Sequence, residues 1–285
     1  MNKPAGNVLL ISSHVARGSV GNRVMGFALE RLGFTVWEVP TVVLPHHPGQ
    51  GPGERIVPDD MAFAALVDDI RGTPDAILSG YLGTPAQAER VAELISRIKA
   101  DNPECRFLCD PVIGDHGKLY VTGEIAATVR DRLLPLADIA TPNAFECNWL
   151  AGSPQDTDLA ATARALAPET VIVTSHPGLM RNHVGNLMVG GGPALLAEHP
   201  SVDSTAHGTG DLFAALYLGR LLQGREPRKA LEMATASTFQ MIAAASKAGS
   251  ADLPFAAAQD VIVQPTAMVS RRQMASKVSI RPEPL

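Results

Sequence analysis

Short apolar runs alternate with longer amphipathic stretches along most of this sequence. The predicted strands cover residues 8–11, 34–39, 76–79, 107–109, 139–140 and 171–174, and the predicted helices between them cover residues 22–32, 84–100 and 123–134. Strands that are apolar throughout and separated by helices are typical of a mainly parallel sheet that is covered on both faces. We therefore expect an α/β fold built in three layers, α/β/α.

Two parts of the chain interrupt this alternation. Residues 40–57 hold four prolines and three glycines, which predicts a substrate loop or small lid over the sheet. Residues 183–203 predict antiparallel strands around a run of three glycines. Helical patterns then cover residues 211–223 and 227–247, and the polar stretch 264–285 is expected to be a loosely held tail.

The composition limits the classes of function open to this chain. Its 285 residues, 46% of them apolar, suffice for one large core, and we expect a single domain over residues 1–285. A formal net charge of −5 without a long basic run argues against a nucleic-acid partner. No apolar run approaches the roughly 18 residues of a membrane span, and the run at residues 8–11 is too short for a signal peptide.

The cysteines indicate a reducing compartment. Cys105, Cys109 and Cys147 show no disulfide framework, which predicts free thiols and a cytoplasmic protein. Cys105 and Cys109 lie four residues apart around an apolar pair. That spacing is compatible with half of a metal site, but cysteines that act as small hydrophobic residues in a buried strand show it more often.

The strongest local signal is the run His207-Gly208-Thr209-Gly210-Asp211 ahead of a long apolar helix. Small residues that open a helix can aim backbone N–H groups at an anion, and the helix dipole favours negative charge there. The same dipole predicts an ionised Asp211 with a low pKa. A carboxylate beside an anion cradle can accept the proton of an attacking hydroxyl, as phosphoryl transfer to an alcohol requires. A Gly-rich turn followed by an acidic first-turn residue is the structural alternative.

Two further polar clusters directly follow predicted strands. Residues 110–115 read DPVIGD and residues 141–146 read TPNAFE. Ligands of α/β sheets bind at the carboxyl ends of strands, where both clusters and the 208–211 loop are expected to lie. Asn143 and Glu146 share a helix face if a helix starts just before them, which suits Mg²⁺ held partly through water. A helix cap at Asn143 with Glu146 completing a capping box is the structural alternative.

These motifs, in this order, resemble those of the ribokinase superfamily. The stretch SSHVARGSVGNR at residues 12–23 and the segment GYLG at residues 80–83 are similar to pyridoxal kinases in particular, and the resemblance runs from about residue 7 to about residue 262. It implies a ribokinase-like fold and ATP-dependent phosphorylation of the 5′-hydroxymethyl group of pyridoxal, with pyridoxine and pyridoxamine as further candidates, in vitamin B6 salvage. It also implies a homodimer with the β segments near the lid at the interface.

The resemblance implies roles for individual residues as well. Asp211 is expected to be the catalytic base, and Gly208, Thr209 and Gly210 are expected to form the anion hole. The residues implied for ATP and for a monovalent cation such as K⁺ are Asp110, Thr141, Glu146, Thr174, His199 and Val202. Those implied for Mg²⁺ are Asp115, Asn143 and Glu146, and those implied for pyridoxal are Ser13, Val20, His47, Tyr81 and Asp211.

The lid departs from the family pattern. Family members often read Asn-His-Thr with a tyrosine shortly after, whereas residues 46–50 read His-His-Pro-Gly-Gln, and Pro48 has neither a hydroxyl nor an N–H donor. This departure leaves the vitamer preference and the efficiency open. Adjacent His46 and His47 are compatible with a zinc site, although adjacent histidines in a proline-rich loop more often hold no metal.

Two other functions stay open. Hydroxymethylpyrimidine kinases share the fold and two of the motifs, but they typically carry cysteine in place of Asp211 and a Gly-rich loop in place of residues 13–15. A non-catalytic vitamin B6-binding protein is the alternative from another class, and an intact Asp211 argues against it. ADP release measured across the vitamers and hydroxymethylpyrimidine distinguishes the three.

Overall fold

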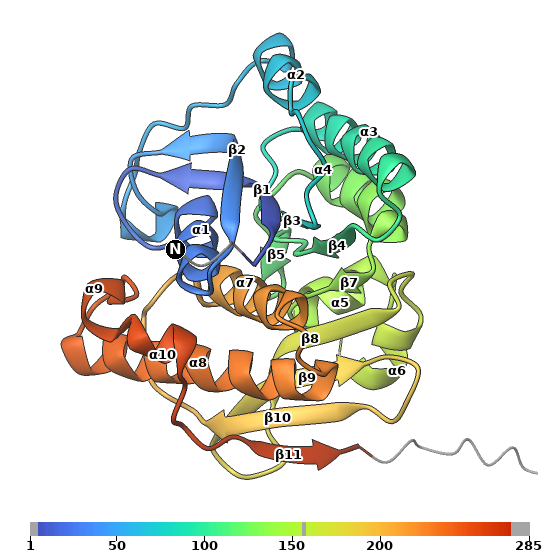
Figure 1. Cartoon of the computed structure of the whole chain (residues 1–285). Coiled ribbons are helices and arrows are strands. Elements are labelled where there is room, and N and C mark those ends of the chain that lie inside the picture. The colour runs from blue at the N-terminus through green and yellow to red at the C-terminus, as the bar shows by residue number, and fades with distance from the viewer. Residues whose placement is uncertain (1–4, 156–157, 275–285) are drawn as a thin grey trace, which may run out of the picture.

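The strand β1, Asn7–Val15, shows how the core is organised (Figure 1). Side chains of a strand alternate between the two faces of a sheet, and here Leu9 and Ile11 join one hydrophobic core while Val8 and Leu10 join another. A strand that is buried on both faces has to be apolar at successive positions. The run of apolar residues at the start of the chain is therefore a central strand.

The computed structural model describes residues 5–155 and 158–274, and within them nine strands form one large sheet in the order β11-β10-β9-β8-β7-β4-β3-β1-β2. From β8 to β2 neighbouring strands are parallel, and β9, β10 and β11 add antiparallel strands at the other end. Besides β1, the strands are β2 Thr35–Leu44, β3 Ala76–Ser79, β4 Arg106–Cys109, β7 Ile139–Ala140, β8 Thr170–Pro177, β9 His183–Val189, β10 Leu195–Pro200 and β11 Ser270–Gln273. A separate small hairpin pairs β5 Gly114–Asp115 with β6 Lys118–Leu119.

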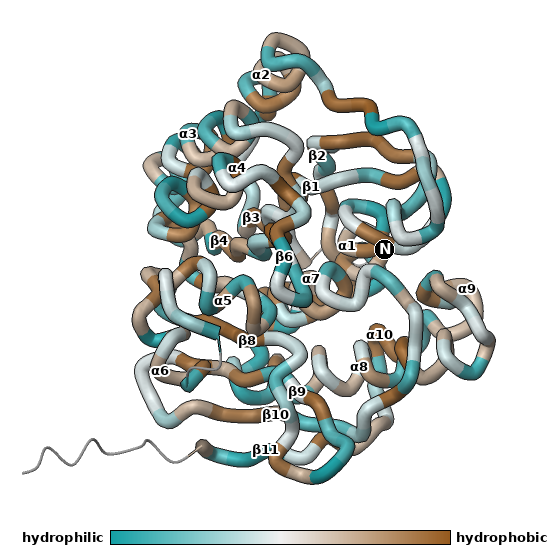
Figure 2. The backbone as a smooth tube through the Cα atoms, turned by 180° about the vertical axis from the view of Figure 1, so that it is seen from behind, coloured by the Kyte–Doolittle hydropathy of each residue, from teal (hydrophilic) through white to brown (hydrophobic). Residues whose placement is uncertain are grey.

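Helices cover both faces of the large sheet (Figures 1 and 2). The core that contains Leu9 is closed by α2 Asp60–Asp68, α3 Pro85–Asp101, α4 Gly123–Thr128, α5 Ala144–Leu150 and α6 Leu159–Arg164. The core that contains Leu10 is closed by α1 Asn22–Arg31, α7 Thr209–Leu222, α8 Pro227–Ala248, α9 Phe255–Ala258 and α10 Asp260–Val263. The expected three-layer α/β/α fold is confirmed.

The lid differs from its expected limits. Residues 40–44, which we expected to belong to the lid, continue strand β2 along β1. The chain then leaves the sheet, forms the short 3₁₀ turn Pro48–Gln50 and returns through an isolated bridge between Val43 and Ile56. Helix α2 follows, and its N-cap Asp59 accepts a hydrogen bond from the Ala62 N–H at 2.8 Å.

The prediction of a loose tail is wrong for residues 270–273. These residues form β11, which pairs with β10, and Arg272 Nε donates to Glu198 Oε1 at 2.7 Å. Glu198 is fully buried, so its carboxylate needs a charged partner, and the tail supplies it. Residues 275–285 of the predicted tail lie outside the described residues.

The three cysteines are free and buried. Burial raises the pKa of the Cys105 thiol to about 11 and the pKa values of Cys109 and Cys147 to about 12. Such thiols are protonated and pack as small apolar groups, as we expected of Cys105 and Cys109, whereas Cys147 lies in helix α5. No helix in residues 5–155 and 158–274 has the length and apolarity needed to cross a membrane.

Candidate active site

The two polar clusters after β4 and β7 meet at one edge of the sheet. Strands β4 and β7 are parallel neighbours with Cys109 opposite Ala140, so the residues that follow them lie side by side. Thr141 Oγ1 donates to Asp110 Oδ1 at 2.9 Å, and both residues are buried. Thr174, at the same edge of β8, donates its N–H to the Pro142 carbonyl at 2.9 Å. The expected meeting of these residues is thus observed.

Asn143 and Glu146 form a capping box at the start of α5. The Asn143 side chain accepts from the Glu146 N–H at 2.9 Å, and Glu146 Oε2 accepts from the Asn143 N–H at 2.9 Å. Asn143 Nδ2 also donates to the Gly114 carbonyl at 2.8 Å. The capping box that we considered as the structural alternative is therefore present. Both polar atoms of the Asn143 side chain already make hydrogen bonds within the chain.

Glu146 also holds the loop that carries the DPVIGD motif. Its Oε1 accepts from the N–H groups of Ile113 and Gly114 at 2.8 and 3.2 Å. Burial raises the pKa of Glu146 to about 7, although these backbone donors and the Asn143 N–H pull it down. Since both carboxylate oxygens are occupied, any approach of Glu146 to a cation uses remaining lone pairs or a water.

Asp211 is held against the turn that follows β1. Its Oδ2 accepts from the Gly21 N–H at 3.0 Å, between segments 190 residues apart in the sequence. Gly21 has a φ of 60° and no room for a side chain, because a Cβ would lie 2.6 Å from Ser13 Oγ and would overlap the Ser13 carbonyl. Ser13, predicted for pyridoxal, and Asp211, predicted as the base, therefore lie on either side of Gly21.

The prediction of a low pKa for Asp211 is wrong. Burial raises its pKa above the ordinary aspartate value, and the hydrogen bond from Gly21 only partly opposes this effect. Asp211 and Glu146 in turn add to the burial that raises the pKa of Asp110. The sequence argument considered the helix dipole but could not include desolvation, which tertiary packing creates. A raised pKa makes Asp211 a better proton acceptor than the sequence indicated.

The glycine-rich loop is packed on the same N-terminal turn. Gly208 has a φ of 81°, and a Cβ there would overlap the Ser19 carbonyl and lie 3.3 Å from the Val20 Cα. Helix α7 starts at Thr209, and a Cβ on Gly210 would meet no atom within 4 Å. The first turn of α7 thus has backbone N–H groups next to open space, which an anion can enter. Val20, predicted for pyridoxal, borders this loop.

His47 and Tyr81 reach the same region from other segments. His47 stacks on His207, with ring centroids 3.9 Å apart. The Tyr81 N–H donates to Ser12 Oγ at 3.0 Å, and the Arg55 guanidinium lies 5.6 Å from the centre of the Tyr81 ring. The five residues predicted for pyridoxal, Asp211 included, are therefore gathered around the end of β1 and the glycine-rich loop.

His199 and Val202 lie apart from this cluster. The buried His199 ring packs on Phe239 of α8 at a centroid distance of 4.5 Å, and its Nδ1 lies 2.9 Å from the Pro200 carbonyl oxygen. Burial lowers the pKa of His199. Within the described residues, neither His199 nor Val202 shares a hydrogen bond or ring contact with the carboxylates of the site.

Tyr120 lies beside the site, although the sequence did not single it out. Its side chain is partly exposed, at 54%, and desolvation together with the carboxylates of Glu146, Asp110, Asp115 and Asp211 raises its pKa. The Tyr120 N–H donates to the Ile113 carbonyl at 3.0 Å. Tyr120 follows the β5–β6 hairpin, and nothing in its spacing from the motifs predicts this position. Asp115 in the same hairpin is exposed.

The donors at this edge fit a hard cation. In the described part of the chain, no three His, Cys, Asp or Glu side chains converge as metal ligands, at His46–His47 or elsewhere. Asp211 and Glu146 nevertheless raise the pKa of Asp110, and Asp115 raises that of Glu146, so a nearby positive charge would stabilise the ionised carboxylates. Oxygen donors with room for waters suit Mg²⁺.

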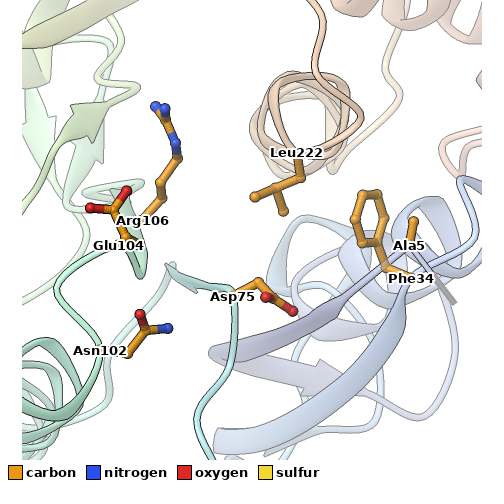
Figure 3. Close-up of a pocket in the computed structure, with 7 residues that line it drawn as sticks. All are labelled: Ala5, Phe34, Asp75, Asn102, Glu104, Arg106 and Leu222. Atoms are coloured by element: carbon orange, nitrogen blue, oxygen red, sulfur yellow. The ribbon is translucent and has the colours of Figure 1, made fainter.

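A separate pocket of about 280 Å³ opens at the amino ends of the strands (Figure 3). Its lining comes from the start of β4, from the residue before β3 and from the end of α7, opposite the edge that carries Asp110 and Asp211. The lining residues are Ala5, Phe34, Asp75, Asn102, Glu104, Arg106 and Leu222. This pocket holds none of the predicted site residues.

Comparison with known proteins identifies the family. A family model described as phosphomethylpyrimidine kinase matches residues 57–256. The chain is 34% identical to a pyridoxal kinase PdxY of Corynebacterium diphtheriae. The match covers 94% of this chain and 100% of that protein. The chain is 35% identical to a pyridoxal kinase PdxY of Rubrobacter xylanophilus, of which 98% is covered, again over 94% of this chain.

Solved structures agree with the sequence comparison. A structure from Bacteroides thetaiotaomicron, described as a putative phosphomethylpyrimidine kinase and determined with pyridoxal, matches with a TM-score of 0.84, 26% identity and coverage of 94% of this chain and 99% of that one. A pyridoxal kinase from Leishmania donovani in complex with ADP and pyridoxamine matches with a TM-score of 0.83 at the same identity and coverage. The chain therefore belongs to the pyridoxal kinase family of ribokinase-like proteins.

Proposed function

We propose that this protein is an ATP-dependent pyridoxal kinase that transfers the γ-phosphoryl group of ATP to the 5′-hydroxyl of pyridoxal. Pyridoxine and pyridoxamine are further candidate substrates. The observation that carries the proposal is the Asp211 carboxylate, which lies in the first turn of α7 and accepts a hydrogen bond at 3.0 Å from the N–H of Gly21, a residue packed against Ser13. The named relatives, which are pyridoxal kinases, support the same activity.

We propose a role for each part of the site. A hydroxyl placed between Ser13 and Asp211 faces the carboxylate that accepts its proton, and the raised pKa of Asp211 favours that transfer. The backbone N–H groups of Thr209 and Gly210 stabilise negative charge on the transferred phosphoryl group. Phosphoryl transfer depends on positioning and charge stabilisation more than on covalent help, and this arrangement supplies both.

We propose that ATP and its cations occupy the edge formed by Asp110, Thr141, Asn143 and Thr174. Mg²⁺ would be held by Asp115 and, through water, by Asn143 and Glu146, while K⁺ would lie on the side of Asp110 and Thr141. When bound, Mg²⁺ neutralises charge on the phosphates. The capping box supports this indirect role, because it fixes the 113–114 backbone that precedes Asp115. His199 and Val202 remain candidates for the outer part of the nucleotide site.

ADP release in the presence of ATP, Mg²⁺ and K⁺ tests the proposal. The substrates are pyridoxal, pyridoxine, pyridoxamine and hydroxymethylpyrimidine, each assayed at the same enzyme concentration. We expect turnover with pyridoxal. Turnover of the pyrimidine alone would overturn the substrate assignment in favour of the activity that the family model's description names. Tight binding of pyridoxal without ADP release would indicate a non-catalytic vitamin-binding protein.

We also propose that the protein is a single-domain, cytoplasmic homodimer. Exposed apolar side chains support a second copy near the lid: Ile56 is 60%, Met61 is 85% and Leu66 is 47% exposed. Ile56 follows the lid, and Met61 and Leu66 lie on the adjacent helix α2. We expect Met61→Glu to convert the dimer to a monomer by light scattering, and an unchanged mass would exclude this face.

A further inference from the structure

Two stacked histidines join the lid to the loop that carries the anion hole. The His47 ring lies 3.9 Å from the His207 ring, with 27° between their planes. His207 directly precedes Gly208, which is packed on the turn after β1. The stack therefore connects the lid to the residues that would bind the phosphoryl group.

The lid backbone lies close against the edges of both rings. His47 caps the 3₁₀ turn Pro48–Gln50, and its Nδ1 accepts from the Gly49 N–H at 3.1 Å. A Cβ on Gly49 would lie 2.9 Å from His207 Nε2 and 3.0 Å from His47 Nδ1. Only glycine leaves enough space for this approach, so the turn is fitted to the stack.

The lid has a second anchor next to the first. Gln50 Nε2 donates to Asp252 Oδ1 at 2.8 Å, and Arg17 Nη2 donates to Gln50 Oε1 at 3.3 Å. The His207 N–H donates to the carbonyl of Ala251, the neighbour of Asp252, at 3.0 Å. The lid therefore rests on three loops of the catalytic edge, and His207 belongs to one of them.

We propose that His207 is a positioning residue that holds the lid over the substrate site, and that protonation of His47 releases the lid. The part of this inference that concerns pyridoxal rests on the proposed function. The part that concerns the lid does not, because it is argued from contacts within the chain.

The charges around the stack set the direction of its pH dependence. Burial lowers the pKa of His47 first, and His207 and His46 lower it further, while Asp252 opposes them. Arg17 adds a positive charge beside Gln50. A proton on His47 Nδ1 also removes the acceptor for the Gly49 N–H. Because the docked lid binds protons less readily than the free lid, docking is favoured above the ordinary histidine pKa of 6.5 and is lost as the pH falls below it.

The contact between His47 and His207 that holds the lid is called the latch here. Tryptic cleavage after Arg55, without ligands, tests the latch independently of activity. Arg55 is exposed in the lid segment, and a released lid presents it to the protease more often. For His207→Ala we expect cleavage to accelerate about two- to tenfold, the range of one lost ring pair. His207→Phe should restore the wild-type rate. His176→Ala, which removes a partly exposed histidine elsewhere, is the matched control. Equal rates in the His207→Ala variant and the wild type would overturn the latch.

The steady-state KM for pyridoxal tests whether the latch serves the substrate. We expect His207→Ala and His47→Ala each to raise this KM, with the double variant no worse than the more affected single variant. Wild-type KM should rise from pH 7.5 to pH 6.0, whereas His207→Phe should show a smaller rise, since the phenyl ring removes the opposing effect of His207 and attracts a protonated His47. Additive effects of the two substitutions, or an unchanged pH profile in His207→Phe, would contradict the proposal. Absence of kinase activity would overturn the proposed function. The cleavage assay would still test the latch, because it does not depend on activity.

Discussion

Asp211 is the residue whose environment differs most from its sequence context. A first-turn position in a helix favours an ionised, weakly basic carboxylate, but burial between Gly21 and the glycine-rich loop raises its pKa. The helix dipole acts on any residue at that position, whereas desolvation depends on what the fold packs against it. The same residue can therefore combine an anion-binding helix start with useful basicity.

We predict that Asp211→Asn lowers kcat about 10²- to 10⁴-fold, the usual cost of losing a general base. Asparagine retains an acceptor for the Gly21 N–H, so the fold and ATP binding should be preserved. Steady-state ADP release gives kcat, and calorimetry of ATP binding is the control. Retention of more than about a tenth of wild-type kcat, outside that range, would show that the base lies elsewhere.

Glu146 completes the capping box that its spacing allowed as the structural alternative to a metal site. Its two oxygens accept three backbone N–H groups, from Ile113, Gly114 and Asn143. In Glu146→Gln, the amide NH₂ must face at least one of these donors. We expect a loss of about 1–3 kcal/mol in unfolding free energy, as for a buried group left without its partner, together with lower turnover. Chemical denaturation measures the first, and an unchanged stability with weaker Mg²⁺ dependence would instead favour direct metal binding.

At the scale of single elements, β11 is the clearest case of a segment stabilised by one ion pair. Arg272 on β11 donates to the fully buried Glu198 on β10, whose other oxygen accepts from the Leu179 and Met180 N–H groups. These contacts lower the pKa of Glu198 against the opposing effect of desolvation. A short polar strand is therefore held at the sheet edge by the charge it brings to its neighbour.

Adjacent arginines on β11 provide a matched test of this ion pair. Arg272→Ala leaves a buried carboxylate oxygen without a partner, and we expect a loss of about 1–3 kcal/mol in unfolding free energy. Arg271 pairs with the partly exposed Glu232 at 3.2 Å, so Arg271→Ala should cost only about 0–1 kcal/mol. Thermal unfolding of both variants checks the difference, and equal losses would mean that Glu198 does not depend on Arg272.

At the scale of the whole molecule, the fold brings several like charges to one edge. Asp110, Glu146 and Asp211 come from segments that follow β4 and β7 or open α7, and burial together with their mutual repulsion raises the pKa of Asp110 well above the ordinary value. Ionised Asp110 therefore destabilises the ligand-free protein at neutral pH. Repulsion between carboxylates at a binding site commonly lowers the free energy of unfolding of the protein.

We predict that Asp110→Asn stabilises the ligand-free protein by about 0.5–2 kcal/mol at pH 7.5 while lowering kcat. A folded pKa above the unfolded value means that the wild type gains stability as pH falls through the folded pKa and keeps it below 3.8. The advantage of the variant should therefore shrink as the pH is lowered. Thermal unfolding between pH 7.5 and 5.5, with and without K⁺, checks this; a constant difference would mean that Asp110 is already protonated at neutral pH.

The sequence by itself determined the layers and most of the elements. The apolar runs that became β1, β3 and β7 are buried on both faces, so their composition alone identified them as central strands. The order of the three polar clusters after strands was enough to place them at one edge, because parallel strands end together. Local composition carries this information since burial selects apolar residues at every position of such strands.

The tertiary structure decided what these residues do to one another. The raised pKa of Asp211, the carboxylate field around Tyr120, the His47–His207 stack and the partner of Glu198 each join segments far apart in the chain. Composition and spacing report the conformation that a segment prefers, but desolvation and electrostatic coupling depend on which other segment arrives beside it. The chemistry of the site therefore follows from contacts that no local pattern in the sequence contains.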